Sequence, residues 1–529
     1  MNKTFLPAAL LTVLAWQAAF AETNRVPVEL FPTRTFAVIR VANLTELDRK
    51  YQETGLPSFF AMMAAQGQLP ANLGLDFERP WYAVWAEDSP KKEMPYAVVP
   101  LADLEAFRKH PMVDNPASKP SYRILGDHAI MGVVPVPEIG GSTLAGKFTG
   151  DIDGMADLNG VRSVFSGEIA AFRTALQTSL VQDLPTHPPD DSNPQENRED
   201  ISGLLQSQIA MFFEFLDQSE LLAIRLDLSD GNLGVAVRYS LDPETPWGKL
   251  VGSQKPRSPA GLERVVGDAS MVSWGSFDLS KNSEVVEPFY TRIGALMQGT
   301  DPDLLLELMR QRGEMVMGGT ALQEGLEFEG IYSLQGSRRR EFQDDFRTLM
   351  RTAAVETPGV TTDYRPRIGK VAGMEVDRLV QEFSGTGTEE LPLGMERMEA
   401  YYGWGKKEIL SLVRFGSEKT DWVDRLQNLA SGSKHPLPDA IRRELDGFPA
   451  KLLMFAWVDL GSLLGGLGDL DPGSGMTEWS GRLPPFASYV TSRGSRLEFG
   501  GSLDLKSVFS AATSLLTPDP GSSGEGDEP

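Results

Sequence analysis

The stretch GGSTLAGKFTG, residues 140–150, contains the residue types of a phosphate-binding loop. Gly141, Gly146 and Lys147 match the G-x-x-x-x-G-K spacing, in which backbone N–H groups and the lysine hold phosphates. That motif needs a magnesium-binding hydroxyl directly after the lysine, but Phe148 stands there. Prolines precede the stretch and glycines follow it, where the motif needs a strand and a helix. We therefore interpret it as a glycine-rich loop and predict no cofactor.

Two acidic loops have oxygen ligands of the kind that calcium prefers. Asp151–Asp153 in GDIDG and Asp469–Asp471 in GDLDPGSG each place two carboxylates two residues apart. An EF-hand loop needs a third ligand, a glycine and a glutamate at its twelfth position, and both segments lack them. Asp-Gly and Asp-Pro are also ordinary turn sequences. We predict turns without a metal, and calcium binding at these loops stays an open alternative.

The sequence does not indicate a catalytic residue. It has no cysteine, no H-E-x-x-H and no G-x-S-x-G motif, and no two histidines stand at metal-ligand spacing. A hydrolase with two catalytic carboxylates remains possible, because such carboxylates meet only in space. The four histidines are His110, His128, His187 and His435.

The charge balance excludes one class of partner. The chain has 529 residues, 73 acidic against 50 basic, and a formal net charge of −23. Nucleic-acid-binding proteins need a basic stripe that displaces counterions, so we expect no nucleic-acid partner. A chain of this length can hold several domains together by core packing without disulfides.

Residues 1–21 have the pattern of a secretory signal peptide. Lys3 precedes an apolar stretch, and Ala19-Phe20-Ala21 is a small-x-small cleavage site. We therefore expect a periplasmic or secreted protein. The most apolar later stretch, residues 452–468, is interrupted by Asp459, so we expect no membrane span after signal cleavage.

Aromatic residues cluster in two predicted strands. PWYAVWAED has Trp81 and Trp85 on one face and Tyr82 on the other, and AYYGWG covers residues 400–405. Exposed aromatics could stack on sugars or pack against a partner. Because both faces of the first strand are apolar, we predict that it is buried in the core.

Six junctions have a short apolar strand that runs into Asp-Leu or Asn-Leu before a helical pattern. A side-chain oxygen at that place can accept the unpaired N–H groups of the first helical turn, so we predict six N-caps. The residues are Asn43, Asp103, Asp157, Asp278, Asp459 and Asp504.

Three hairpins are also predicted, because alternating runs flank turn residues. They span residues 221–241, 398–417 and 486–505, with turns near Asp230-Gly231, Gly405-Lys406 and Arg493-Gly494.

Strand, capped helix, hairpin and helix recur along the chain and predict its fold class. Five such units fall loosely at residues 35–110, 153–252, 269–353, 368–430 and 451–516. We expect an α+β fold of repeated strand–helix–hairpin–helix units, forming mainly antiparallel sheets with helices packed on one face.

The expected domain organisation follows from these patterns. The ranges are 1–21 signal peptide, 22–183 N-terminal α+β region, 184–200 disordered linker or loop, 201–260 hairpin and helix completing the N-terminal half, 261–360 central α+β unit, 361–516 C-terminal α+β region and 517–529 disordered acidic tail.

The stretches GLDFERPWYAVWAED, MPYAVVPLADLEAFRKH and YRILGDHAIMGVVP share a loose pattern with a known group of sequences. There the chain resembles uncharacterised exported proteins of planctomycete- and verrucomicrobium-type bacteria. The resemblance implies export and a repeat-like α+β body, and it implies no reaction.

We therefore expect an exported acidic protein with a non-catalytic binding, scaffold or interaction role in the cell envelope, whose partner is an unknown protein or envelope component. The alternatives are a carboxylate-dependent hydrolase of an envelope or environmental polymer and a carrier of an apolar ligand. Facing carboxylates in a deep cleft would favour the hydrolase, an apolar tunnel the carrier, and a flat apolar patch the interaction protein.

Overall fold

The computed structural model of the chain forms two compact units. Unit 1 comprises Met1–Ala170 and Glu220–Tyr239, and unit 2 comprises Ala171–Ser219 and Ser240–Pro529. The structure describes residues 27–65, 73–89, 91–110, 113, 121–140, 144, 148–182, 194–267, 269–288, 290–291, 302–322, 325–334, 339–353, 360–383, 396–416, 421–470 and 483–516.

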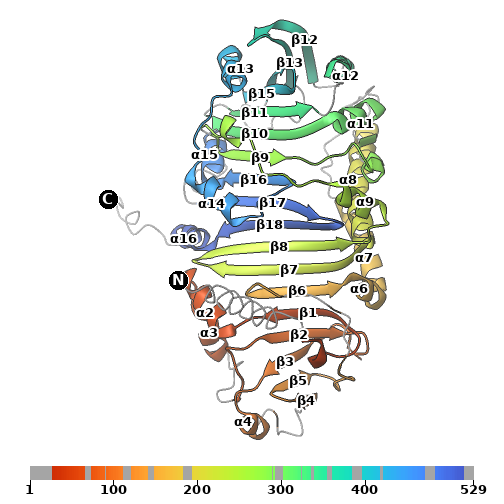
Figure 1. Cartoon of the computed structure of the whole chain (residues 1–529), viewed down its shortest axis with the longest axis vertical. Helices are drawn as coiled ribbons and strands as arrows, with labels where there is room; N and C mark the ends of the chain where they lie inside the picture. Colours follow the sequence, from red (N-terminus) through yellow and green to blue (C-terminus); the bar gives the residue numbers. More distant parts are fainter. Residues whose placement is uncertain are drawn as a thin grey trace, which may run out of the picture. The chain divides into compact units, whose positions relative to one another are not determined.

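The described part of unit 1 is an antiparallel sheet with short helices. Its strands lie in the order β4-β5-β3-β2-β1-β6-β7, and β8 follows β7 through a two-residue turn (Figure 1). The elements are η1 Val28–Leu30, β1 Thr35–Val41, α2 Leu44–Glu53, α3 Phe59–Ala65, β2 Trp81–Ala86, β3 Tyr96–Pro100, α4 Leu104–Lys109, β4 Ser121–Leu125, β5 His128–Gly132, β6 Ile152–Asp157, α6 Leu158–Val164, β7 Ser219–Ser229 and β8 Asn232–Leu241.

Unit 2 is a larger antiparallel sheet in the order β18-β17-β16-β9-β10-β11-β15-β14-β13-β12. Helix α7, Ser166–Gln182, begins in unit 1 and continues into unit 2. The other elements are α8 Pro194–Asp217, α9 Pro246–Ser253, η2 Leu262–Arg264, β9 Met271–Gly275, η3 Ser283–Val285, α11 Pro302–Gln311, β10 Arg312–Leu322, β11 Gly325–Leu334, α12 Arg339–Ala353, β12 Val360–Val371, β13 Met374–Phe383, β14 Arg397–Trp404, β15 Glu408–Gly416, α13 Trp422–Ser431, α14 Asp439–Gly447, β16 Met454–Asp459, α15 Leu460–Leu470, β17 Pro485–Arg493, β18 Arg496–Asp504 and α16 Leu505–Leu516. The expected α+β class with antiparallel pairing is confirmed.

The cores show where helices cover the sheet of unit 2. Tyr401 and Tyr402 are neighbours in β14, so their side chains point to opposite faces. Tyr401 packs in a core that includes residues of α13 and α14, whereas Tyr402 packs with residues of α11 and α12. Figure 1 shows α13 and α12 on either side of β13. Helices therefore lie on both faces of this part of the unit 2 sheet, whereas helices on one face were expected.

Five of the six predicted N-caps are confirmed. Asn43, Asp103 and Asp157 accept backbone N–H groups in the first turns of α2, α4 and α6. Asp459 and Asp504 do the same for α15 and α16, through the N–H groups of Ser462 and Ser507.

Asp278 departs from the prediction. Its carboxylate accepts the N–H of Ser280, 2.8 Å away, which closes a local turn. No helix begins there: the next element is η3, which starts at Ser283, and Asn282 before it makes no side-chain cap. The expected N-cap at Asp278 is wrong, because the carboxylate closes a turn two residues long instead of a helical turn.

This difference gives a direct comparison. Asp459→Ala should lower the free energy of unfolding by about 1 kcal/mol, because it removes a helix cap. Asp278→Ala should lower the free energy of unfolding less than Asp459→Ala does, because Asp278 does not cap a helix. Urea unfolding of both variants checks this, and an equal loss in both would contradict the distinction.

The three hairpins are confirmed as β7–β8, β14–β15 and β17–β18. Asp230 and Gly231 both have positive φ, 51° and 82°, as the type I′ turn between β7 and β8 requires. The expected loop at 184–200 is shorter than predicted, because residues 194–200 belong to α8. The expected signal peptide at 1–21 and the expected tail at 517–529 lie outside the described residues, as do His187 and Asp471.

Candidate functional site

One face of the unit 1 sheet is apolar and only partly covered. Four strands each contribute three residues to it, and none of the twelve is buried. Ile39 of β1 and Ile224 of β7 are the most exposed, at 42% and 37%. We name this surface the unit 1 apolar face; it consists of Trp81, Ala83 and Trp85 on β2, Ala37, Ile39 and Val41 on β1, Ile152, Gly154 and Ala156 on β6, and Leu222, Ile224 and Leu226 on β7.

The strand registers place these residues in three rows. Ile39 pairs with Ala83 on one side and with Gly154 on the other, and Gly154 pairs with Ile224. Gly154 has no side chain, and a Cβ built there would make ordinary van der Waals contact with Ile224 at 3.7 Å and with Ile39 at 3.9 Å. The middle row therefore has two exposed isoleucines with a glycine between them.

The opposite face of the same strands forms the core. Val38, Tyr82, Val84 and Met155 alternate with the residues of the apolar face and are buried together. The prediction of core packing for PWYAVWAED is therefore confirmed for one face only, and on the other face Trp81 packs partly buried against a neighbouring core cluster. Tyr82, Val84 and Ala86 are buried, whereas Trp81, Ala83 and Trp85 are only partly covered.

Aromatic rings extend the unit 1 apolar face beyond β2. Trp81 stacks on Phe77 with ring centres 5.2 Å apart and an interplanar angle of 16°, and Phe77 contacts Phe60 edge-on. Phe59, next to Phe60 on α3, is 42% exposed. The Trp81 N–H donates to the carbonyl of Asp76 at 2.8 Å, which leaves the apolar ring surface for packing.

Buried Asp48 holds this aromatic extension in place. Its carboxylate accepts the N–H of Phe59 at 2.5 Å and the hydroxyl of Ser58 at 2.8 Å. Asp48 lies on α2 and is 8% exposed, so it anchors the first turn of α3 to α2. α3 therefore has a defined position beside the face.

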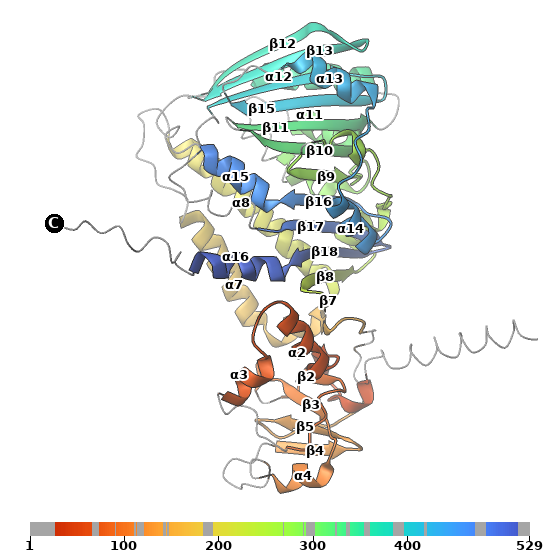
Figure 2. The ribbon, with the colours of Figure 1, turned by 90° about the vertical axis from the view of Figure 1, so that its left-hand side faces the viewer.

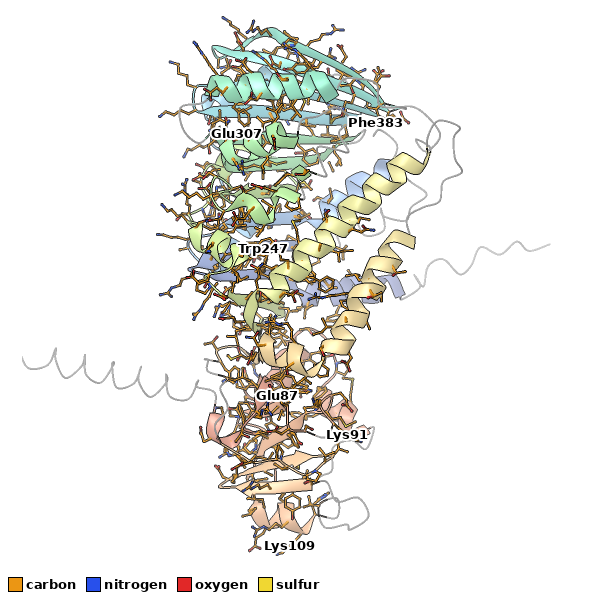
Figure 3. The ribbon with its side chains drawn as sticks, turned by 90° about the vertical axis from the view of Figure 1, so that its right-hand side faces the viewer. Glu87, Lys91, Lys109, Trp247, Glu307 and Phe383 are labelled. Carbon is orange, nitrogen blue, oxygen red and sulfur yellow. The ribbon has the colours of Figure 1, made fainter. Side chains whose placement is uncertain are left out.

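One edge of the unit 1 apolar face is acidic. Glu87 follows β2, Asp157 ends β6 and Glu220 lies exposed near the start of β7. Figure 3 labels Glu87, which forms an ion pair with Arg34. Asp157 caps α6, so Glu220 is the exposed carboxylate of these three.

The turn expected at Asp151 and Asp153 is wrong for Asp153, which lies on β6, and both carboxylates are bonded to side chains and backbone groups of the chain itself. Lys50 lies 2.7 and 2.9 Å from the two oxygens of Asp151, which also accepts the N–H of Leu228. Asp153 lies 3.0 Å from Arg40 and accepts the N–H of Gly150. Both carboxylates thus neutralise buried or half-buried cations.

The second predicted acidic loop begins at Asp469. Asp469 lies on α15, not in a loop.

The glycine-rich stretch at 140–150 has structural neighbours. Phe148, at the position where a phosphate loop needs a hydroxyl, is 1% exposed and packs in the unit 1 core. The next regular element is strand β6, not a helix. Lys147 lies outside the described residues.

Among the described residues of unit 2, the most buried carboxylate is that of Asp377 on β13. Its oxygens accept from Arg347 at 2.7 and 2.9 Å, from the Tyr364 hydroxyl at 2.8 Å, from the Trp404 indole at 2.9 Å and from the N–H of Arg367 at 2.8 Å. Burial alone would raise the pKa of Asp377, but these donors lower it below the usual value. With all its acceptor sites used, Asp377 cross-links α12, β12 and β14.

A second cluster lies on β11 and α13. Arg425 forms ion pairs with Glu327 and, at 3.1 Å, with Glu329. Burial raises the pKa of Glu329, Arg425 opposes this shift, and the nearby Glu327 adds to it. Glu327 also lies 3.9 Å from Arg414, so arginines contact both carboxylates and the cluster is suited to holding α13 on the sheet.

Two further polar features of the described residues are the contact of His128 with Asp127 and a pocket in unit 2. His128 contacts Asp127 at 2.8 Å, and no group of three or more His, Asp or Glu residues in the described part is arranged to hold a metal ion. Unit 2 also has a pocket of about 280 Å³. Its two cations and two carboxylates balance, and Arg257 already pairs with Glu314. The pocket is lined by Lys255, Arg257, Ser276, Asp278, Gly313, Glu314, Ser333 and Leu334.

Comparisons with known proteins add little to this geometry. No protein-family model matches the chain, and no curated protein matches it. Three crystal forms of TP0453, forms III, IV and I, are similar at 13%, 13% and 12% identity, with TM-scores of 0.25, 0.25 and 0.23. The similarity covers 48%, 51% and 50% of this chain and 98%, 100% and 99% of those chains. TM-scores this low carry no argument about fold or function.

In the described residues, no helix is both long and apolar enough to cross a membrane.

Proposed function

We propose that the protein is a non-catalytic interaction protein of the cell envelope, which binds an amphipathic helix of a partner protein on the unit 1 apolar face. The observation that carries this proposal is the set of twelve apolar residues on four adjacent strands, none of them buried. Exposed patches of a few hundred Å² on a monomer often mark interaction sites.

The size of the face favours a helix over a second copy of the chain. Four strands about 4.8 Å apart and five residues of about 3.3 Å each cover roughly 300 Å². Two such faces packed together would bury about 600 Å², half of the roughly 1,200 Å² that small specific interfaces bury. A single helix is about 10 Å wide and fits within the face, with the aromatic extension at Trp81 to receive further side chains.

The charge of the chain determines which helix suits the face. Glu220 lies exposed near the start of β7, and the whole chain has a net charge of −23. A helix with an apolar stripe flanked by lysine or arginine complements this charge, whereas an anionic membrane surface is repelled. The expected signal peptide at residues 1–21 supports a location in the envelope.

A peptide titration tests the proposal. A synthetic leucine–lysine amphipathic helix should bind the purified chain in fluorescence anisotropy, and a peptide of the same composition in scrambled order should not. The double variant I39Q/I224Q should bind the helix at least about tenfold more weakly, a loss of about 1.4 kcal/mol. Both isoleucines are partly exposed, so thermal unfolding should change little.

The matched control is V133Q. Val133 is 67% exposed after the end of β5, away from the four strands, and its replacement should leave binding unchanged. Equal loss in V133Q, or binding unchanged in I39Q/I224Q, would contradict the site. Binding to anionic vesicles with no binding to the peptide would contradict the helix and indicate a membrane surface.

A further inference from the structure

The outer edge of strand β12 is open to another strand. In the described part of the chain β12 pairs with β13 alone, and Figures 1 and 2 both show β12 at the end of the unit 2 sheet. Of the twelve residues of β12, only Val371 is buried. An unpaired strand edge presents a row of backbone N–H and C=O groups that a further extended strand can bond.

The two halves of β12 differ in how this edge is protected. Residues 365–371 contain Pro366 and a register irregularity between Arg365 and Gly369. Proline and irregular pairing are devices that keep a strand edge from joining another strand. Residues 360–364 contain no proline, and their pairing with β13 is regular. We name residues 360–364 the β12 edge.

The hydrogen bonds of β13 show which way the β12 edge directs its backbone groups. The N–H of Phe383 on β13 donates to the carbonyl of Glu396, which directly precedes β14, at 2.8 Å. Phe383 therefore bonds toward β14. Because antiparallel strands alternate these bonds, odd-numbered residues of β13 bond to β14 and even-numbered residues bond to β12.

Three residues of the β12 edge consequently direct their backbone groups outward. Even-numbered residues of β13 pair with Thr361 and Asp363, which therefore bond inward to β13. Val360, Thr362 and Tyr364 alternate with these two, so their N–H and C=O groups point away from β13. Outward groups on every second residue are what a further antiparallel strand needs.

A second copy of the chain supplies a strand that matches this spacing. In a sheet continued across a two-fold axis, one residue must lie opposite itself, since only then do paired side chains share a face. If that residue is Thr362, Val360 lies opposite Tyr364 of the second copy, and all three outward residues are used. If it were Asp363, two carboxylates would lie directly opposite each other and repel.

Thr362 lies on the two-fold axis in this register. Its backbone exchanges two hydrogen bonds with Thr362 of the second copy, and the two hydroxyls lie opposite each other. Threonine pairs of this kind stabilise antiparallel strands. The Thr362 Oγ1 accepts from the amide of Gln381 at 3.4 Å and keeps its own proton to donate.

The flanking side chains are complementary as well. Val360 opposite Tyr364 is a pair of a β-branched and an aromatic residue, which also stabilises antiparallel strands. Thr361 lies opposite Asp363, whose carboxylate can accept from the threonine hydroxyl. Asp363 already pairs with Arg365 at 2.8 Å, so residues 360–364 bring no unpaired charge into the contact.

We propose that the chain forms a two-fold dimer in which the β12 edges of two copies pair antiparallel and join their unit 2 sheets. The three outward residues give about six backbone hydrogen bonds, two for each pair. Five residues of about 3.3 Å span only about 17 Å, so the contact buries less than the roughly 1,200 Å² of a standard interface, and the dimer is weak and reversible. This contact is independent of the helix-binding face proposed for unit 1.

Sedimentation velocity over a dilution series of the purified chain tests the proposal. The net charge of −23 repels two copies, so the series is run at high salt, where dimer should replace monomer as the concentration rises. T362P removes an outward N–H without removing a bond to β13. It should weaken the dimer at least about tenfold, or about 1.4 kcal/mol.

The matched control is K370P. Lys370 pairs with Glu375, an odd-numbered residue of β13, so its N–H also points outward, but it lies in the protected half of β12. K370P should therefore dimerise as the original chain does. Equal loss of the dimer in T362P and K370P would overturn the proposal.

A charge exchange keeps the test decisive if T362P folds poorly. T362K and T362D each place like charges opposite each other on the two-fold axis, so neither should dimerise alone. An equimolar mixture of the two should form a heterodimer, because lysine then faces aspartate. A chain that stays monomeric at every concentration, a dimer unchanged in folded T362P, or a mixture that stays monomeric would each overturn the proposal.

Discussion

Replacing Arg347 with methionine is expected to destabilise unit 2 by about 3–5 kcal/mol, because it leaves the carboxylate of Asp377 buried without its charge partner. Asp377 has no exposed surface, and the Arg347 side chain is 5% exposed. The remaining donors, Tyr364, Trp404 and the N–H of Arg367, are uncharged and compensate only in part. Urea unfolding of R347M measures the loss.

The matched control is R365M. Arg365 forms an ion pair with Asp363 at 2.8 Å, but its side chain is 64% exposed. Solvent screens such a pair, so unfolding of R365M should match that of the original chain within error. A loss in R347M no larger than that in R365M would show that the other donors suffice for Asp377.

The pH dependence of R347M follows from the same cluster. In the original chain the pKa of Asp377 is lowered, so its contribution is fully present above the unfolded pKa of about 3.9 and is lost as the pH falls through the folded value. In R347M burial is no longer opposed by a cation, so the folded pKa rises above the unfolded value. Protonation then stabilises R347M, and the stability gap between the two proteins should narrow as the pH falls from 7 toward 4. A gap independent of pH would mean that R347M loses packing alone.

Local features of the fold were predictable from the sequence. Asn43 and Asp157 are followed by helices whose first N–H groups lie within reach of their own side chains, so residue type and spacing suffice. The turn at Asp230 and Gly231 is equally local, since few residues adopt positive φ at both positions. Asp278 has the same sequence pattern, but the residues after it do not begin a helix.

The candidate sites depend on contacts that are distant in sequence. The strand β2 has apolar residues on both faces, and its sequence alone predicts complete burial. Whether Trp81 and Trp85 are covered depends on which helices pack on that face of the sheet.

The buried ion pairs could not be predicted from the sequence for the same reason. The donors to Asp377 come from α12, β12 and β14, and in the sequence each is an ordinary arginine, tyrosine or tryptophan. The sequence of β13, MEVDRLVQEF, mixes charged and apolar residues, so nothing local to this strand marks Asp377 as buried.

Replacing Arg40 with methionine is the corresponding prediction for unit 1. Arg40 and Asp153 are 5% and 4% exposed, and their side chains lie 3.0 Å apart between β1 and β6. Arg40 also donates to the carbonyl of Gly150 at 2.8 Å and lies over the Phe148 ring. R40M should lower the free energy of unfolding by about 3 kcal/mol, because the buried carboxylate of Asp153 keeps its charge but loses its cation. Hydrogen exchange of the β1 and β6 amides measures this loss within unit 1.

A second substitution separates charge from packing in this prediction. Asp153 accepts the N–H groups of Thr149 and Gly150, and the amide oxygen of an asparagine can accept them too. R40M/D153N removes the uncompensated charge and keeps that acceptor, so it should be more stable than R40M. Arg40 lies between Ile39 and Val41 and points to the opposite face, so the double variant should still bind the leucine–lysine helix once folded. If R40M/D153N were no more stable than R40M, the packing of Arg40 on Phe148, not its charge, would hold β1 to β6.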